Sequence, residues 1–201
     1  MGEPETWTSE EFGTSHEGKV GVLLADGTEP DPVVYPSNSG AWSSEVAHWS
    51  VYDGQPSNGP RAAVLRAVCS CGWTGPEQPL NWKEIGDQPL RRAADDVAGT
   101  CVTQWDHHIE DVDRSAIALP TELAELMSKV EEQIEKLPKD AALVALRAAR
   151  RMEVQASRLA YWPAHDVRRD TSVEEAAAAL GLNVDDTRAL LARFGNWSRY
   201  A

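Results

Sequence analysis

"RAVCSCGWTG", residues 66–75, brings together two of the three cysteines of the chain. Cys69 and Cys71 are one residue apart, and alternate residues of a strand point to the same side of a sheet. Gly72 follows them and allows the backbone to turn sharply. Two thiolates on one face can hold one ion, and zinc is the ion that best suits Cys and His ligands. The sequence therefore predicts that Cys69 and Cys71 bind one Zn²⁺.

The third ligand is expected from a helix. Residues 89–112 begin with a proline and carry apolar residues at spacings of three and four, which predicts an amphipathic helix. His108 lies on the apolar stripe of this helix, close to its end. We therefore expect His108 to face the cysteines and to be the third ligand.

His48 is the favoured fourth ligand. It lies in residues 45–54, whose alternating pattern predicts a strand, and residues 61–73 are predicted to be the second strand of the same hairpin. Such a hairpin brings His48 near the cysteines, although the sequence does not determine the register. His107 and Cys101 stay open as alternatives. Cys101 lies roughly 10 Å along the helix from His108, which is a long span for two ligands of one ion, and it is more typical of a small buried side chain.

The order of these residues resembles a known group of proteins. Cys-x-Cys-Gly-Trp at 69–73 is followed, about thirty residues later, by Trp-x-x-His at Trp105 and His108. This pattern is similar to that of small uncharacterised Cys/His proteins common in high-GC bacteria. The resemblance implies a bound metal and implies no reaction.

Motifs of catalysis are missing from the sequence. It contains no His-Glu-x-x-His, no His-x-Glu with Pro-Cys-x-x-Cys, no Gly-rich phosphate loop and no Gly-x-Ser-x-Gly. Asp106 and Glu110 flank the paired histidines, but acids at such positions are usually a solvated helix face. We therefore expect a structural zinc and a protein that is not an enzyme.

The second half of the chain is predicted to be helical. Four helices are expected, ending at prolines or glycines, over residues 118–137, 139–162, 171–182 and 183–195. Pro163 is expected to end the second of them. The third and fourth are expected to pack on the second and to bury five apolar side chains: Ala177, Leu180, Leu182, Leu190 and Leu191.

The sequence "VEEAAAALGLNVDDTRALL", 173–191, resembles the helix-turn-helix of bacterial transcriptional regulators and sigma-type factors. The resemblance implies binding to duplex DNA, with Asn183, Arg188 and Arg193 as the contacting side chains. Asp185 and Asp186 depart from the pattern, because carboxylates on the reading face oppose phosphates.

The charge of the chain is uneven. Residues 1–113 carry 19 acidic and 6 basic side chains, a net charge of −13, whereas residues 114–201 carry 13 of each. An acidic surface repels nucleic acid and favours basic partners. Any DNA binding is therefore expected from the second half, and any binding to a basic protein surface from the first.

These observations predict an α+β protein with three parts. Residues 1–40 are expected to be a loosely structured arm with one short strand, residues 41–113 a zinc-supported hairpin-and-helix module, and residues 114–201 a helix-turn-helix-like bundle. No apolar run suits a membrane helix, and the polar start "MGEPETWTSEEF" is unlike a secretory signal, so a cytoplasmic location is expected. The predicted function is a zinc-stabilised, transcription-associated regulator. The alternative is a non-enzymatic acidic adaptor or inhibitor that mimics DNA and binds a protein partner.

Overall fold

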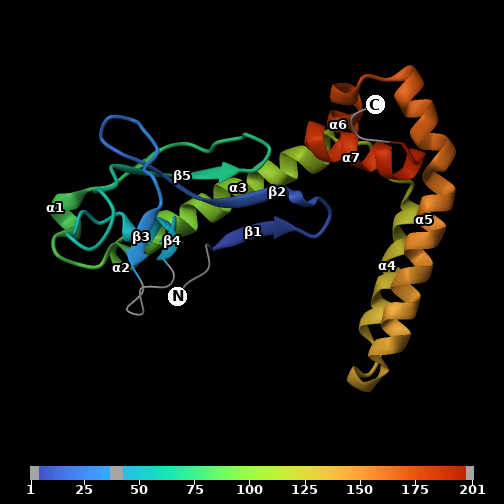
Figure 1. Cartoon of the computed structure of the whole chain (residues 1–201), viewed down its shortest axis with the longest axis horizontal. Coiled ribbons are helices and arrows are strands. Elements are labelled where there is room, and N and C mark those ends of the chain that lie inside the picture. The colour runs from blue at the N-terminus through green and yellow to red at the C-terminus, as the bar shows by residue number, and fades with distance from the viewer. Residues whose placement is uncertain (1–4, 37–42, 198–201) are drawn as a thin grey trace. The chain divides into compact units, whose positions relative to one another are not determined.

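The computed structural model describes residues 5–36 and 43–197 and has an α+β fold (Figure 1). The chain divides into two compact units, Met1–Val112 and Asp113–Ala201. This division lies within one residue of the predicted boundary between residues 113 and 114. None of the helices in the described part of the chain is long and apolar enough to cross a membrane.

The first unit is built on a four-stranded antiparallel sheet of order β1-β2-β5-β6. Its strands are β1 (Thr6–Ser9), β2 (Gly13–Leu23), β5 (Val64–Cys69) and β6 (Gln78–Pro79). A separate two-stranded sheet pairs β3 (Val33–Pro36) with β4 (Ser43–Val46), and the short 3-10 helix η1 (Trp49–Val51) follows.

Three helices complete the first unit: α1 (Trp82–Ile85), α2 (Leu90–Ala93) and α3 (Asp95–Ser115). The helix predicted over 89–112 is confirmed, with an interruption at Ala94. The core is formed by buried apolar residues of the sheet, of the helices and of the segments between them: Val20, Val22, Trp49, Tyr52, Ala62, Leu65, Ala67, Cys69, Ile85, Leu90, Ala94, Cys101 and Trp105.

Two sequence-based predictions about the first unit are wrong. Residues 45–54 and 61–73 do not form a hairpin, because β4 pairs with β3 and β5 pairs with β2. Residues 1–40 are not a loose arm with one short strand: within their described part the predicted strand belongs to the long β2, and β1 and β3 are formed as well. The cause is the alternation of β2, which buries every second side chain from His16 to Val22 and so makes it a better partner for β5.

The second unit is helical, as predicted. It contains α4 (Thr121–Glu135), η2 (Lys139–Ala141), α5 (Ala142–Asp170), α6 (Val173–Leu180) and α7 (Val184–Gly195). The expectation that Pro163 ends a helix is wrong, since α5 continues through it to Asp170. Packing on α7 extends the helix: Ala164 is buried, and His165 Nε2 lies 3.1 Å from the Gly195 carbonyl oxygen.

The turn between α6 and α7 is held by local chemistry. Ser172 and Glu175 form a capping box at the start of α6, and Gly181 ends the helix in a left-handed conformation with φ of 63°. Asn183 then caps α7 by accepting a hydrogen bond from the Asp186 N–H at 2.8 Å. The two helices and the supporting α5 have the order that the sequence predicts.

The expected core of this bundle is confirmed only in part. Ala177 is buried, but Leu180 is 42% exposed, so its assignment to the core is wrong. The three other predicted leucines are half-buried: Leu182, Leu190 and Leu191. Beside Ala177, the buried residues of these helices include two further alanines and one hydroxyl side chain: Ala176, Ala192 and the fully buried Thr187. Thr187 is tolerated there because its hydroxyl donates to the Asn183 carbonyl at 2.9 Å.

Candidate metal centre

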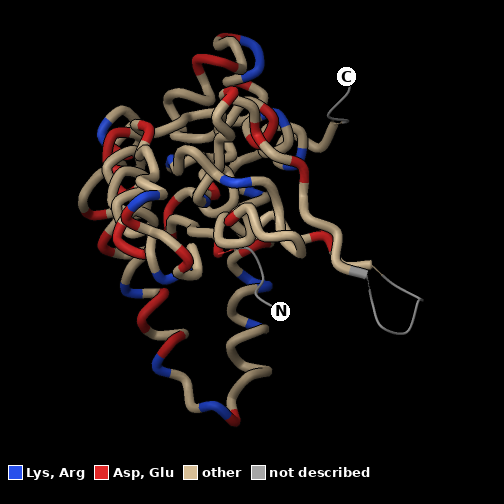
Figure 2. The backbone as a smooth tube through the Cα atoms, turned by 90° about the vertical axis from the view of Figure 1, so that its left-hand side faces the viewer, with Lys and Arg blue, Asp and Glu red and all other residues tan. Residues whose placement is uncertain are grey.

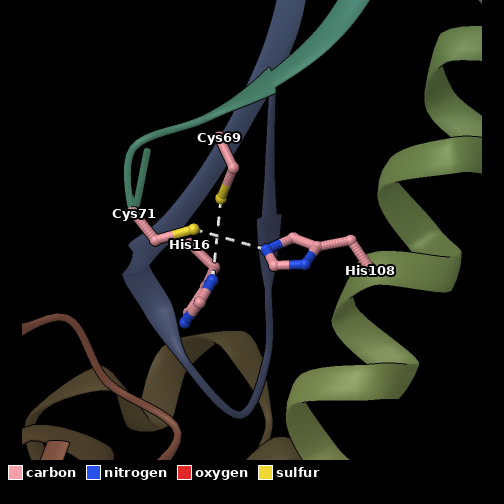
Figure 3. Close-up of side chains that lie close together, drawn as sticks. All are labelled: His16, Cys69, Cys71 and His108. Atoms are coloured by element: carbon pink, nitrogen blue, oxygen red, sulfur yellow. Dashed lines mark hydrogen bonds between the residues drawn. The ribbon is translucent and has the colours of Figure 1, made fainter. Parts of the chain in front are cut away.

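Four side chains of the first unit converge on one point (Figure 3). They are His16 of β2, Cys69 at the end of β5, Cys71 in the following turn and His108 of α3. Their ligand atoms all lie within 4.8 Å of one another. Cys69 Sγ is 3.6 Å from His16 Nδ1, and Cys71 Sγ is 3.4 Å from His108 Nε2. A tetrahedral zinc with two sulfur and two nitrogen ligands separates them by about 3.3–3.8 Å, so the two distances suit zinc.

The sequence predicts that both cysteines point from one face of a strand. In the structure a tight turn brings them together instead. β5 ends at Cys69, and the Gly72 N–H donates to the Cys69 carbonyl at 2.9 Å. The Cys69 N–H in turn donates to the Trp73 carbonyl at 2.9 Å. Gly72 has φ of 93°, which residues with a side chain rarely adopt. The turn therefore folds Cys71 back beside Cys69.

Ser70 fastens this turn to the strand that carries His16. Its hydroxyl oxygen accepts the Glu17 N–H at 2.8 Å and lies 3.1 Å from the carbonyl oxygens of Thr14 and Ser15. The Ser70 N–H also donates to the Glu17 carbonyl at 2.8 Å. The register between β2 and β5 is thus determined next to the site, where Gly18 lies opposite Cys69.

Aromatic rings orient both histidines. The Trp73 indole stacks on His108, with ring centroids 4.4 Å apart and planes 3° apart. Phe12 meets His16 edge-on at 5.7 Å. His16 is buried, at 5% exposure, whereas His108 is half-buried. Packing of this kind restricts the rings before any ion binds, which reduces the entropy lost on binding.

The thiols of the pair are coupled. A hydrogen bond with Cys71 lowers the pKa of Cys69 well below its ordinary value, and the same bond raises the pKa of Cys71. A bound cation would favour the thiolate form of both cysteines. Burial alone raises the pKa of Cys101 to about 11, which makes this third cysteine a poor ligand.

Three of the four predicted ligands come together, and the fourth is replaced. Cys69, Cys71 and His108 lie in the cluster, but His48 does not. His48 caps η1 instead, where its Nδ1 lies 2.7 Å from the Ser50 hydroxyl and its Nε2 lies 3.8 Å from a Glu5 carboxylate oxygen. The assignment of His48 as a ligand depends on the hairpin over 45–73, which the structure does not form.

The two alternatives do not reach the cluster either. His107 is exposed on α3, and Cys101 is fully buried in the core about two turns before His108. The fourth position belongs to His16, which sequence reasoning missed. A signal was present: His16 is in phase with Val20 and Val22, so continuing the alternation of that strand toward its start places His16 on the core face.

The three residues proposed to contact DNA are all near α7 but are engaged locally. The Asn183 side chain caps the helix and donates to Asp186 at 2.9 Å. Arg188 pairs with Asp185 at 2.8 Å. Arg193 is exposed, with its guanidinium 4.6 Å from the ring centre of Phe194.

Comparison with known proteins found no match among family models, curated proteins or solved structures. Only the geometry of the four side chains therefore indicates a metal.

Proposed function

We propose that the chain is a zinc-binding protein in which His16, Cys69, Cys71 and His108 hold one structural Zn²⁺. The convergence of these four ligand atoms within 4.8 Å carries the proposal. Two thiolates and two imidazoles are a common ligand set of structural zinc, and four protein ligands fill a tetrahedron without leaving a position for water or substrate.

The ion would connect elements that are far apart in the sequence. His16 comes from β2, the cysteines from the end of β5, and His108 from α3. A bound zinc thus fastens the sheet to the helix that covers it. Its binding free energy adds directly to the folding free energy of this unit.

Metal analysis of the purified chain tests the proposal. We expect about one zinc per chain, and Cys69→Ser or His16→Ala should remove most of it because each deletes one of four ligands. Cys101→Ser and His48→Ala are matched controls that change the same residue types outside the cluster and should keep the zinc.

Two results would overturn the proposal. One is a wild-type chain that contains no zinc after purification and takes up none when zinc is added. The other is a His16→Ala variant that binds zinc as tightly as the wild type does.

A second candidate function is regulation of transcription through the α5–α7 bundle. It is supported by the sequence of a helix, a turn at Gly181 and a capped second helix, packed on α5. The first unit, with its acidic excess, would then contact a partner protein or a basic surface and not the DNA.

A DNA titration distinguishes binding of α7 to duplex DNA from binding of its acidic residues to a basic protein. The double change Asp185→Asn and Asp186→Asn should tighten binding to duplex DNA if α7 enters the groove, since two repulsive charges disappear with little change of shape. If the acidic residues instead bind a basic protein, the same change should weaken that complex. A wild type that binds neither DNA nor a basic protein at low salt argues against both.

A further inference from the structure

The hairpin of α4 and α5 leaves an unusual number of large apolar side chains in water. α4 has no buried residue, and in the long α5 only Ala164 is buried. The exposed apolar residues between positions 119 and 162 are Leu119, Leu123, Leu126, Met127, Val130, Leu143, Val144, Leu146, Met152, Val154, Leu159, Tyr161 and Trp162. Their exposures run from 37% for Tyr161 to 82% for Leu143.

These side chains form stripes along the helices. On α4, Leu123, Leu126 and Val130 follow one another at spacings of three and four residues and share one face. On α5, Val144, Met152 and Leu159 share a face at spacings of eight and seven. Stripes of this kind are typical of helices that pack against other helices.

The exposed area is large for a free surface. Together these side chains present on the order of 1,000 Å², spread over more than one face of the two helices, and a single apolar patch on a typical monomer reaches roughly 300–600 Å². Each partner in a standard protein interface buries about 800 Å². The stripes of α4 and α5 are therefore of the scale that an interface between two proteins uses.

The charges of the two helices are opposite. Residues 121–135 of α4 contain five Glu and one Lys, a net charge of −4. Residues 142–162 of α5 contain four Arg and one Glu, a net charge of +3. Among the described residues, the ion pairs of this region connect residues of the same helix, as Lys129 with Glu125, Lys136 with Glu132 and Arg150 with Glu153. The opposite charges of α4 and α5 are therefore available to bind another molecule. Acidic residues (red) and basic residues (blue) both lie along the hairpin at the bottom of Figure 2.

We propose that a second copy of this chain covers the hairpin, forming a four-helix bundle in which α4 of one copy lies against α5 of the other. In a dimer with a two-fold axis this contact occurs twice. The hairpin is complementary to a second copy of itself, because the acidic α4 of each copy meets the basic α5 of the other. The apolar stripes supply the affinity. The charges favour the pairing of α4 with α5 over the pairing of α4 with α4 or of α5 with α5. A partner of a single charge would match only one of the two helices.

Light scattering of the full-length chain over a range of concentrations tests the proposal. We expect the mass of a dimer at micromolar concentration. Leu126→Glu and Leu159→Glu, made separately, should each weaken the dimer at least tenfold, since a charge is placed on the stripe. Leu180→Glu is the matched control, because Leu180 is also an exposed leucine of the second unit but lies outside the hairpin. Its dimer should persist.

Reversing charges on both helices adds a test that a folding defect cannot reproduce, because the second pair of changes should restore the dimer that the first pair weakens. Arg151→Glu with Arg158→Glu should weaken the dimer, and adding Glu131→Arg with Glu135→Arg to the same chain should restore it. Circular dichroism checks that each variant keeps its helices. Leu126 and Leu159 are 53% and 68% exposed, so glutamate at these positions is solvated in the monomer.

Three outcomes would overturn the proposal. The first is a wild type that stays monomeric at all concentrations, which would result if the first unit of the same chain covered the hairpin. The second is a dimer that Leu126→Glu and Leu159→Glu leave unchanged. The third is a higher oligomer that also forms in both glutamate variants.

Discussion

Gly18 lies directly beneath the indole ring of Trp105. A Cβ atom at position 18 would be 2.5 Å from Trp105 Nε1, which is far inside van der Waals contact. Gly18 is also opposite Cys69 in the sheet, and Trp105 precedes His108 by one turn of α3. This single missing side chain therefore sets how closely α3 approaches the strand that carries His16.

Gly18→Ala should destabilise the first unit by roughly 1–3 kcal/mol, the usual cost of overpacking a tight core. Because the helix must move away from the sheet, the same change should also weaken zinc binding through His108. Denaturant titration and a zinc competition assay measure the two effects. Gly99→Ala is the matched control: apart from the adjoining backbone of α3, no atom lies within 4 Å of its added Cβ, so it should stabilise α3 by about 0.5–1 kcal/mol. Equal effects of the two changes would contradict this account of Gly18.

At the scale of elements, the packing of α6 on α7 depends on small side chains. Ala176 and Ala177 are each 4% exposed, and Ala192 of α7 is 5% exposed. Small residues let the two short helices approach closely, and the leucine that precedes Gly181 is left at the surface. The apolar pattern of the sequence predicts both Ala177 and Leu180 in the core, and only the alanine is buried.

Leu180→Ala should therefore cost about 1 kcal/mol or less, below the roughly 2–5 kcal/mol of a buried Leu→Ala change. Ala177→Leu should cost roughly 1–3 kcal/mol, because the contact between the helices has no room for it. Thermal unfolding of the two variants compares them directly. A larger loss for Leu180→Ala than for Ala177→Leu would show that the assigned contact is wrong.

At the scale of the whole molecule, the chain consists of two units with different sources of stability. The first unit has a mixed core of strands and short helices and contains the candidate metal centre. The second is helical and buries little, apart from the contacts of α5, α6 and α7. Removal of a metal should affect the two units differently.

A chelator should unfold or loosen the first unit and leave the helical second unit largely intact. Each kcal/mol of lost binding free energy lowers the unfolding midpoint by about 4–8 °C for a unit of this size. Near-ultraviolet circular dichroism reports mainly the first unit, which contains six of the eight tryptophans, and the far-ultraviolet signal reports mainly the helices, most of which lie in the second unit. The Cys69→Ser variant provides the control, since a chelator should not lower its midpoint further. A chelator that lowers the midpoint of wild type and variant alike would contradict the proposed role of zinc.

The sequence by itself determined the local features of this protein. The closeness of Cys69 and Cys71, the amphipathic stripe that carries His108 and the boundary between the last two helices each depend on residues a few positions apart, so pattern and propensity suffice to predict them. The α+β class and the boundary near residue 113 follow from the same patterns.

Only the tertiary structure decided which strands pair and hence which histidine completes the site. His16 and Cys69 are 53 positions apart, and a strand shows its alternation in the sequence but not its partner. His48 and His16 both lie in segments with such alternation, and only the pairing of β2 with β5 separates them. In the same way, the burial of Leu180 or Ala177 depends on how closely two helices approach, which is a property of the packed bundle and not of either helix.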